Sequence, residues 1–198
     1  MLNLLFTNPY AFVVILGGII LAIGIHEAAH AFMADYLGDP TPRTLGRTTL
    51  NPLAHLDPYG TLAIIFTGFF GWGKPTPFDP YNLRNPRRDT ALIALAGPAS
   101  NIVLAVLLSL ITKLTSMPSQ VLVVFYGLVS LNVNLALFNL IPVPPLDGSK
   151  LLPTSHPLLK TNSLMLILLL ILPIFGGYSV AYLIISPISR LIINFLLP

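Results

Sequence analysis

The stretch His26-Glu27-Ala28-Ala29-His30 lies inside an almost uncharged segment that runs from residue 10 to residue 36. On a helix, residues four positions apart share a face, so the two imidazoles of this HExxH pattern can hold one metal ion. The carboxylate of Glu27 stands beside the first imidazole, where a base that activates water is needed. Ionisable groups at membrane depth are costly and by default indicate function. The stretch therefore predicts a metal-dependent hydrolytic site inside a segment apolar enough to cross a bilayer.

The composition predicts an integral membrane protein. Of the 198 residues, 55% are hydrophobic and only 9% are charged, whereas soluble domains carry about 25% charged residues. A large soluble core is the alternative, but several windows exceed the ~20 apolar residues that span a bilayer. The net charge of +3 comes without a basic cluster, so we expect contact with lipid and no nucleic-acid binding. The absence of cysteine excludes disulfides and thiolate ligands.

Four long helices are predicted, over residues 10–37, 91–113, 120–142 and 163–186. Pro173 and the pair Gly176-Gly177 can break the last one, and residues 187–198 are either an interfacial helix or a further short pass. We therefore expect an all-α membrane protein, a polytopic helical bundle of about four to five transmembrane helices. It forms one domain, residues 1–198, with a catalytic core of about 10–150 and a C-terminal transmembrane region of 163–198.

Residues 61–70 form a short apolar segment that needs a separate interpretation. Ten residues are too few for an ordinary spanning helix. The segment is rich in β-branched and aromatic residues and is followed by Gly71-Trp72-Gly73-Lys74-Pro75. We therefore predict a short re-entrant β-hairpin that enters the membrane against protein.

Helix direction supports the re-entrant interpretation. His26 lies about nine residues from Asp35, or roughly 13 Å from that membrane face. Asp147 comes just after the helix predicted over 120–142. If residues 61–70 crossed the bilayer, His26 and Asp147 would lie toward opposite faces. A re-entrant segment brings both toward the same face, where they can share a metal ion.

The distribution of cations predicts the orientation. With a re-entrant segment, eight cations lie on one side and Lys113 and Arg190 on the other. By the positive-inside rule the crowded side is cytoplasmic, so the active site faces the cytoplasm of a multi-pass cell-membrane protein. The first apolar segment contains the motif itself and lacks a basic n-region, so no cleavable signal peptide is expected. The eight cations are Arg43, Arg47, Lys74, Arg84, Arg87, Arg88, Lys150 and Lys160.

Asp147 is the acidic residue best suited to be the third ligand. A catalytic zinc site uses three protein ligands and one open position. Asp147 follows a segment in which three of four residues are proline, 142–145, and these prolines end the preceding helix in an extended backbone at membrane depth. Alone, this sequence would indicate an ordinary exit loop with an Asp-Gly turn. Together with HExxH it predicts a site of two histidines and one carboxylate, a set that favours Zn²⁺.

At this point the sequence resembles a known family. HEAAH (26–30) and NLIPVPPLDG (139–148) are similar to the paired signatures of the site-2 protease family of intramembrane zinc metalloproteases, in its compact prokaryotic branch without a PDZ domain. Supporting similarities are NPLAHLDPYG (51–60), GWGKP (71–75) and GPASN (97–101). The resemblance implies one zinc ion per chain and hydrolysis of peptide bonds within or next to transmembrane segments of substrate proteins.

The resemblance also implies roles for individual residues. His26, His30 and Asp147 would be the zinc ligands and Glu27 the catalytic acid and base. Asn101 would hold the substrate backbone or support the oxyanion, although an asparagine that joins helices is equally compatible. Gly71-Trp72-Gly73 resembles a re-entrant strand whose edge pairs with unwound substrate, or it is an interfacial turn anchored by Trp72.

Several alternatives remain at this stage. His55 is an alternative ligand, a partner of a ligand or a surface loop residue, and His156 is expected in a loop. A membrane metal-binding or transport protein without hydrolysis is the alternative function, although no inverted repeat is visible. An inactive scaffold is disfavoured because Glu27 is present. The predicted partners are a substrate transmembrane segment and the lipid bilayer, and the sequence leaves the oligomeric state open.

The predicted orientation can be tested with a single cysteine, because the chain has none of its own. We expect Arg87→Cys to react with a membrane-impermeant maleimide from the cytoplasmic side alone. Labelling of intact cells from outside would overturn the re-entrant interpretation of residues 61–70.

Overall fold

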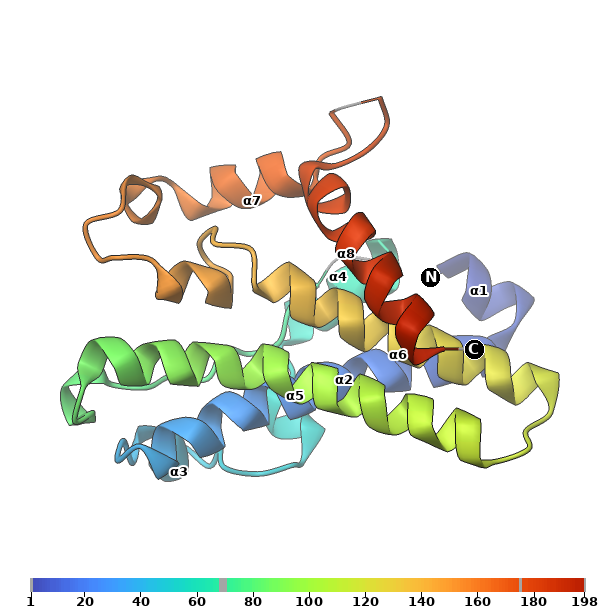
Figure 1. Ribbon diagram of the computed structural model, residues 1–198, viewed down its shortest axis with the longest axis horizontal. Helices are drawn as coiled ribbons and strands as arrows, with labels where there is room; N and C mark the ends of the chain where they lie inside the picture. Colours follow the sequence, from blue (N-terminus) through green and yellow to red (C-terminus); the bar gives the residue numbers. More distant parts are fainter. Residues whose placement is uncertain (1, 68–70, 175, 198) are drawn as a thin grey trace.

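Three long helices form the body of the molecule. The computed structural model describes residues 2–67, 71–174 and 176–197. Helices α2 (Pro9–Tyr36), α5 (Pro86–Leu114) and α6 (Ser119–Asn139) lie side by side along its longest axis and pack against one another (Figure 1). By length and composition, these three described helices can cross a membrane.

The three helices alternate in direction. α2 ends and α5 begins at the same end of the bundle, and α6 returns to that end (Figure 1). The 49 residues 37–85 between α2 and α5 therefore leave and re-enter the bundle at one end. This arrangement, expected from helix direction, places the C-terminal half of α2 and the segment after α6 at the same end.

Asparagine and proline residues set where the long helices begin. The side chain of Asn8 accepts a hydrogen bond from Ala11 N, and Pro9 occupies the first helical position of α2. α5 likewise begins at Pro86, and the buried Asp89 accepts a hydrogen bond from Asn85 N at 2.9 Å. The predicted start of α2, residue 10, is within one residue of the structure, whereas α5 begins five residues before the predicted residue 91.

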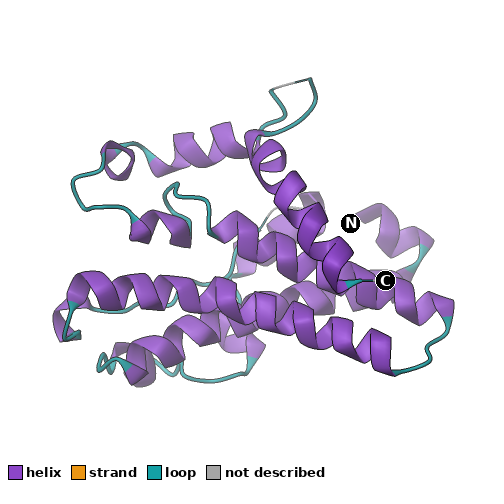
Figure 2. Cartoon of the chain, viewed as in Figure 1, coloured by secondary structure: helices purple, strands orange, loops and turns teal. Residues whose placement is uncertain are grey.

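Shorter helices complete the chain (Figure 2). The remaining elements are α1 (Leu2–Thr7), α3 (Thr41–Thr44), η1 (Pro52–His55), α4 (Pro58–Thr67), η2 (Pro80–Asn82), η3 (Asp147–Leu151), η4 (Pro157–Lys160), α7 (Ser163–Ile171) and α8 (Val180–Leu196), where η marks a 3₁₀ helix.

The hairpin predicted over residues 61–70 is wrong where the structure describes it. Residues 61–67 belong to helix α4, and residues 68–70 lie outside the described residues. A helix is more stable than a strand here because Asp57 Oδ1 accepts a hydrogen bond from Gly60 N at 2.8 Å, and Pro58 occupies the start of the helix. The described residues form one antiparallel bridge, between Leu56, which precedes α4 in the sequence, and Gly73, which follows it.

The long helix predicted over residues 163–186 is also wrong. It is divided into α7 and α8, with Pro173 and a turn at Gly176 and Gly177 between them. Both glycines adopt positive φ, 57° and 85°, which residues with a Cβ rarely adopt. Four to five transmembrane helices were predicted, whereas three helices of the described chain are long enough to cross a membrane. Helices α7 and α8 are apolar but shorter.

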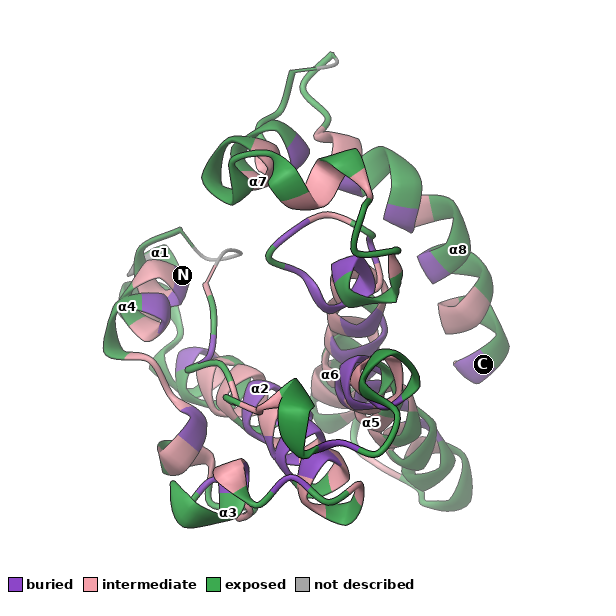
Figure 3. Cartoon of the chain, turned by 90° about the vertical axis from the view of Figure 1, so that its left-hand side faces the viewer, coloured by how far each residue is buried: buried purple, intermediate pink, exposed green. Residues whose placement is uncertain are grey.

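Figure 3 shows a thin buried core, and many of the exposed residues around it are large and apolar. The buried residues of α2, α5 and α6 lie where these helices face one another, whereas their outer faces expose large apolar side chains. A soluble protein rarely exposes so continuous an apolar surface. Contact with lipid tails explains it, and the chain is a multi-pass membrane protein.

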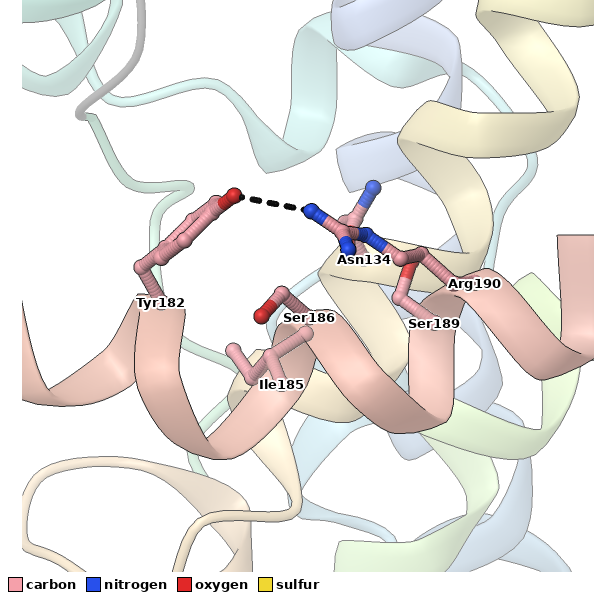
Figure 4. A pocket seen from close by; sticks show the side chains of 6 residues that line it. All are labelled: Asn134, Tyr182, Ile185, Ser186, Ser189 and Arg190. Atoms are coloured by element: carbon pink, nitrogen blue, oxygen red, sulfur yellow. Dashed lines mark hydrogen bonds between the residues drawn. The ribbon is translucent and has the colours of Figure 1, made fainter. Parts of the chain in front are cut away.

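Helix α8 crosses α6 and leaves a pocket of about 320 Å³ between them (Figure 4). Arg190 Nη2 donates a hydrogen bond to Tyr182 Oη across its mouth at 3.3 Å. The pocket contains none of the residues predicted for the metal site. It is lined by Asn134, Tyr182, Ile185, Ser186, Ser189 and Arg190.

Asp39 joins three elements at the end of α2. Its fully buried carboxylate accepts hydrogen bonds from Thr41 N (3.1 Å), Thr41 Oγ1 (2.6 Å), Asn82 Nδ2 (2.8 Å) and Asp79 N (2.7 Å). Burial acts to raise the pKa of Asp39, but these hydrogen bonds outweigh it and hold the pKa below its ordinary value of 3.8. The carboxylate therefore fixes the loops at the end of the bundle where α2 ends.

We expect Asp39→Asn to lower the free energy of unfolding by about 1–3 kcal/mol, because an amide group then faces the Asp79 N–H. Since the folded pKa is lowered, the Asp39 contribution is complete above the ordinary value and is lost as the pH falls through the folded value. Thermal unfolding in detergent at several pH values measures this.

The matched control for this measurement is Asp35→Asn. Asp35 pairs with the exposed Arg43 at 2.6 Å, so its loss should change the stability by less than about 1 kcal/mol. Equal effects of the two variants would contradict the role assigned to Asp39.

Candidate metal centre

Three side-chain atoms from distant parts of the chain meet in one buried cluster. Asp147 Oδ2 lies 3.0 Å from His26 Nε2 and 3.0 Å from His30 Nε2, and the two Nε2 atoms are 3.1 Å apart. All three residues are more than nine-tenths buried. The residues predicted as a ligand set are therefore brought together, and they form a group that could hold a metal ion.

The tautomers of the histidines follow from their partners. His26 Nδ1 lies 2.6 Å from Asn101 Oδ1, and His30 Nδ1 lies 2.7 Å from Ile93 O. Both partners are oxygen acceptors, so each Nδ1 carries the proton and, in the neutral ring, each Nε2 presents a lone pair. Two nitrogen lone pairs and a carboxylate oxygen thus point at one another.

This donor set fits a zinc ion. Three electron-pair donors at about 3 Å repel one another unless a cation lies among them. Ligand atoms in a tetrahedral zinc site lie ~2.0–2.1 Å from the ion and so about 3.4 Å from each other, close to the separations found here. Two histidines, one carboxylate and an open position are also a donor set that catalytic zinc sites use.

One face of α5 is complementary to the histidine pair. Ile93, Gly97 and Asn101 follow one another at intervals of one turn, and α5 runs antiparallel to α2. Ile93 O contacts His30, Asn101 contacts His26, and Gly97 lies between them. A Cβ at Gly97 would lie 2.4 Å from His30 Nε2 and 2.6 Å from His26 Nε2, so only glycine leaves this space free.

Asn101 holds His26 as part of a chain of hydrogen bonds. Its Nδ2 donates to Asn132 Oδ1 at 3.0 Å and to Ala22 O at 3.2 Å, and Asn132 Nδ2 donates to Leu128 O at 2.9 Å. Asn101 has no exposed surface. The geometry thus favours orientation of the histidine over direct contact with a substrate. Such partners of metal ligands fix the ring orientation and strengthen metal binding.

Asp147 reaches the cluster through the proline-rich segment after α6. Its second oxygen, Oδ1, accepts a hydrogen bond from Lys150 Nζ at 3.0 Å, which leaves Oδ2 directed at the histidines. A Cβ at Gly148 would lie 2.2 Å from Leu140 O, so the neighbouring glycine permits this close return of the chain. The Asp-Gly pair is therefore part of the site and not only a turn.

Glu27 lies next to the cluster and is half-buried. Its Oε2 accepts a hydrogen bond from Thr76 N at 2.9 Å, and its main-chain oxygen accepts one from Thr76 Oγ1 at 2.9 Å. The extended segment that follows Gly73 thus runs directly along the second residue of the HExxH pattern.

Gly71-Trp72-Gly73 lies against α4 and η1. Cβ atoms at Gly71 and Gly60 would each meet the other segment's backbone within 2.4 Å, so these glycines allow α4 and residues 71–72 to touch. Gly73 is buried and forms the bridge to Leu56. Of the three residues predicted to contact substrate, Gly73 thus lies beside Glu27, and both glycines have a packing role as well.

The remaining histidines lie outside the cluster. His55 is fully buried and contacts Thr49 O through Nε2 at 2.9 Å, so it supports the loop before α4. His156 caps η4 by accepting a hydrogen bond from Leu158 N at 3.3 Å. None of the alternatives for His55 fits fully: it lies outside the ligand cluster, and it is buried in η1 and not in a surface loop.

Two residues that contact the site, Asn132 and Thr76, are absent from the residues predicted from the sequence. Asn132 interrupts the apolar helix α6, a signal that could have been used. Thr76 stands between Pro75 and Pro77, but a sequence pattern could not reveal that it faces Glu27.

Comparison with known proteins agrees with this site. Residues 11–120 and 111–163 match Peptidase family M50. "Putative zinc metalloprotease YwhC" of Bacillus subtilis is 39% identical over 148 residues, which cover 70% of this chain and 67% of that protein. No solved structure shows a significant match.

Longer relatives match as well. "Putative zinc metalloprotease Rip2" of Mycolicibacterium smegmatis is 34% identical over 145 residues, and its namesake in Mycobacterium tuberculosis is 32% identical over 145 residues. In both cases the alignment covers 69% of this chain and 55% of the relative, so the chain spans little more than half of their length.

The three-helix membrane bundle and its His, His and carboxylate cluster define a membrane metallopeptidase. The chain belongs to peptidase family M50, as its resemblance to the site-2 proteases predicted. It is thus a metalloendopeptidase, and its metal is zinc.

We expect Gly97→Ala to lower zinc affinity at least about 10-fold, because the added methyl group occupies the space between the two Nε2 atoms. The matched control is Gly127→Ala in α6, where a Cβ meets nothing within 4 Å. Zinc content of the purified proteins, measured by mass spectrometry during dialysis against a chelator, gives the comparison. Equal zinc retention in both variants would contradict the assignment.

Proposed function

We propose that this chain is a zinc-dependent intramembrane endopeptidase that hydrolyses peptide bonds within or next to transmembrane segments of other proteins. The observation that carries the proposal is that the buried side chains of His26, His30 and Asp147 meet beside Glu27. The two histidines and Glu27 lie on α2, a helix long and apolar enough to span the bilayer. A water-using centre in such a place suits a peptide bond that is itself in the membrane.

In this proposal His26, His30 and Asp147 hold the metal. When bound, zinc acts as a Lewis acid that polarises the scissile carbonyl and lowers the pKa of water enough to make it a nucleophile near neutral pH. Asn101 and Ile93 O keep the two imidazoles oriented through their Nδ1 protons. Lys150 holds Asp147 Oδ1 and thereby orients Oδ2.

Glu27 performs the proton transfers. Its carboxylate accepts the proton that the attacking water gives up, and the resulting carboxyl group donates it to the amide nitrogen as the carbon–nitrogen bond breaks. Such a base and acid contributes ~10²–10⁴-fold to the rate.

The substrate would contact residues 71–73. A transmembrane helix satisfies its own amides, so cleavage requires local unwinding and new partners for the exposed groups. In support of this role, Gly73 lies beside Glu27 and already pairs as a strand does, in an antiparallel bridge to Leu56. The proposed partners are therefore a substrate transmembrane segment and the surrounding lipid, and the site opens toward the cytoplasmic side of the cell membrane.

The test of this proposal is Glu27→Gln, which keeps the size of the side chain and removes the base. We expect cleavage of single-pass substrates in nanodiscs to fall by about 10²–10⁴-fold while zinc content stays the same. Mass spectrometry of the products should locate the cleaved bond within or next to the substrate's apolar segment.

The control is Asp35→Asn on the same helix, which should cleave at the wild-type rate because Asp35 pairs with the exposed Arg43 away from the site. Cleavage that survives Glu27→Gln would refute the mechanism. Zinc binding by the wild-type protein without cleavage of any substrate would instead favour a metal-binding or transport protein.

A further inference from the structure

Thr76 is the one residue between Pro75 and Pro77, and the backbone around it is unusually restricted. Proline fixes its own φ and has no N–H, and a residue that precedes proline is confined to extended conformations. Within residues 75–77, Thr76 therefore presents the single backbone donor, in a direction that the two prolines limit before any contact forms.

The segment before Thr76 is held on both sides. Lys74 N donates to His55 O at 2.8 Å, and the buried Arg47 donates through Nη2 to Lys74 O. Both polar groups of the Lys74 backbone are thus satisfied. The segment can neither slide along η1 nor move away from it without losing these hydrogen bonds.

Gly73 allows this segment to lie close to α2. A Cβ there would lie 2.6 Å from Ile23 Cγ2 and 3.3 Å from Glu27 Cγ. The approach of residues 73–76 to Glu27 therefore depends on the sequence itself. It requires the absence of a side chain at Gly73, and the two prolines around Thr76 restrict the backbone at the other end.

Thr76 contacts Glu27 twice, and the two contacts have different consequences. The backbone N–H of Thr76 binds Oε2 of the carboxylate, and its hydroxyl binds the main-chain oxygen of the same glutamate. Together they fix the carboxylate relative to its own backbone and so fix the rotamer. No hydrogen bond from the described residues reaches the other oxygen, Oε1.

We propose that Thr76 is the positioning residue of Glu27: it occupies Oε2 and leaves Oε1 as the oxygen that exchanges the proton with water and the leaving amine. This inference rests on the proposed function, in which Glu27 is the base and acid. It adds that the two carboxylate oxygens have separate tasks. Arg47 and His55 act one step further away, by holding the segment that carries Thr76.

Amide exchange tests the contact without any substrate. In ¹⁵N-labelled protein, zinc-free and zinc-loaded, we expect the Thr76 amide to be protected and to exchange at least about 10-fold faster in Glu27→Ala. The Lys74 amide, bonded to His55 O in the same segment, should keep its protection in that variant. Unchanged exchange at Thr76, or equal loss at both amides, would overturn the inference.

Kinetics test the consequence. We expect Thr76→Val, which keeps the shape and loses the hydroxyl, to lower kcat by about 3–10-fold with KM and zinc content unchanged. Thr76→Ser, which keeps the hydroxyl, should restore kcat to within about 2-fold. A wild-type kcat in Thr76→Val, a change in KM alone, or failure of the serine variant to restore kcat would each contradict positioning.

Different results would refute the proposed function and the positioning role of Thr76. Full cleavage by Glu27→Gln would refute the proposed function, whatever Thr76 does. Loss of cleavage in Glu27→Gln, together with wild-type kinetics in Thr76→Val and no protection of the Thr76 amide, would leave the proposed function intact and refute the positioning role.

Discussion

The approach of α5 to α2 at Gly97 is the constraint on which the metal centre depends. Two neutral imidazoles can present lone pairs to a common point only if both Nδ1 protons have acceptors elsewhere. α5 supplies these acceptors one turn before and one turn after Gly97, from Ile93 O and Asn101 Oδ1. The glycine itself leaves the intervening space free. Any side chain at this position would separate the two helices and remove all three conditions together.

Membrane burial explains why the polar groups of the candidate metal centre and their neighbours on α5 and α6 are hydrogen-bonded. An unpaired polar group costs more in lipid than in water, because no solvent compensates it. His26, Asn101 and Asn132 accordingly form a continuous chain that ends on a main-chain oxygen of α6. The two carboxylates follow a common pattern: in both Asp147 and Glu27, one oxygen is held by the protein and the other is directed elsewhere. These hydrogen bonds therefore do more than lower the cost of burial, because they distinguish the two oxygens of each carboxylate.

Much of this arrangement could be predicted from the sequence, because its signals are local or topological. The HExxH spacing predicted that His26 and His30 share a face, and helix direction predicted that Asp147 would return to them. The cap at Asn8 and the proline at Pro9 mark the start of α2, and Pro86 marks the start of α5. These signals need no knowledge of tertiary contacts.

The rest depended on competition between signals or on contacts across the fold. At residues 61–67 the cap at Asp57 outweighs β-branched composition, so a helix forms where a strand was predicted. Between α7 and α8, the turn at Gly176-Gly177 interrupts an apolar stretch that is long enough to form one helix. Thr76 and Asn132 act through residues 49 and 31 positions away, Glu27 and Asn101, a kind of relation that one sequence does not display.

Helix α6 contributes to the centre from two places. Asn132 on the helix supports His26 through Asn101, and the proline-rich segment that leaves its end carries Asp147. A sideways displacement of α6 would strain one proposed ligand and the support of another at the same time. Under the proposed function, a substrate helix would therefore have to reach the centre past elements that carry no proposed ligand, and α4, α7 and α8 are three of these.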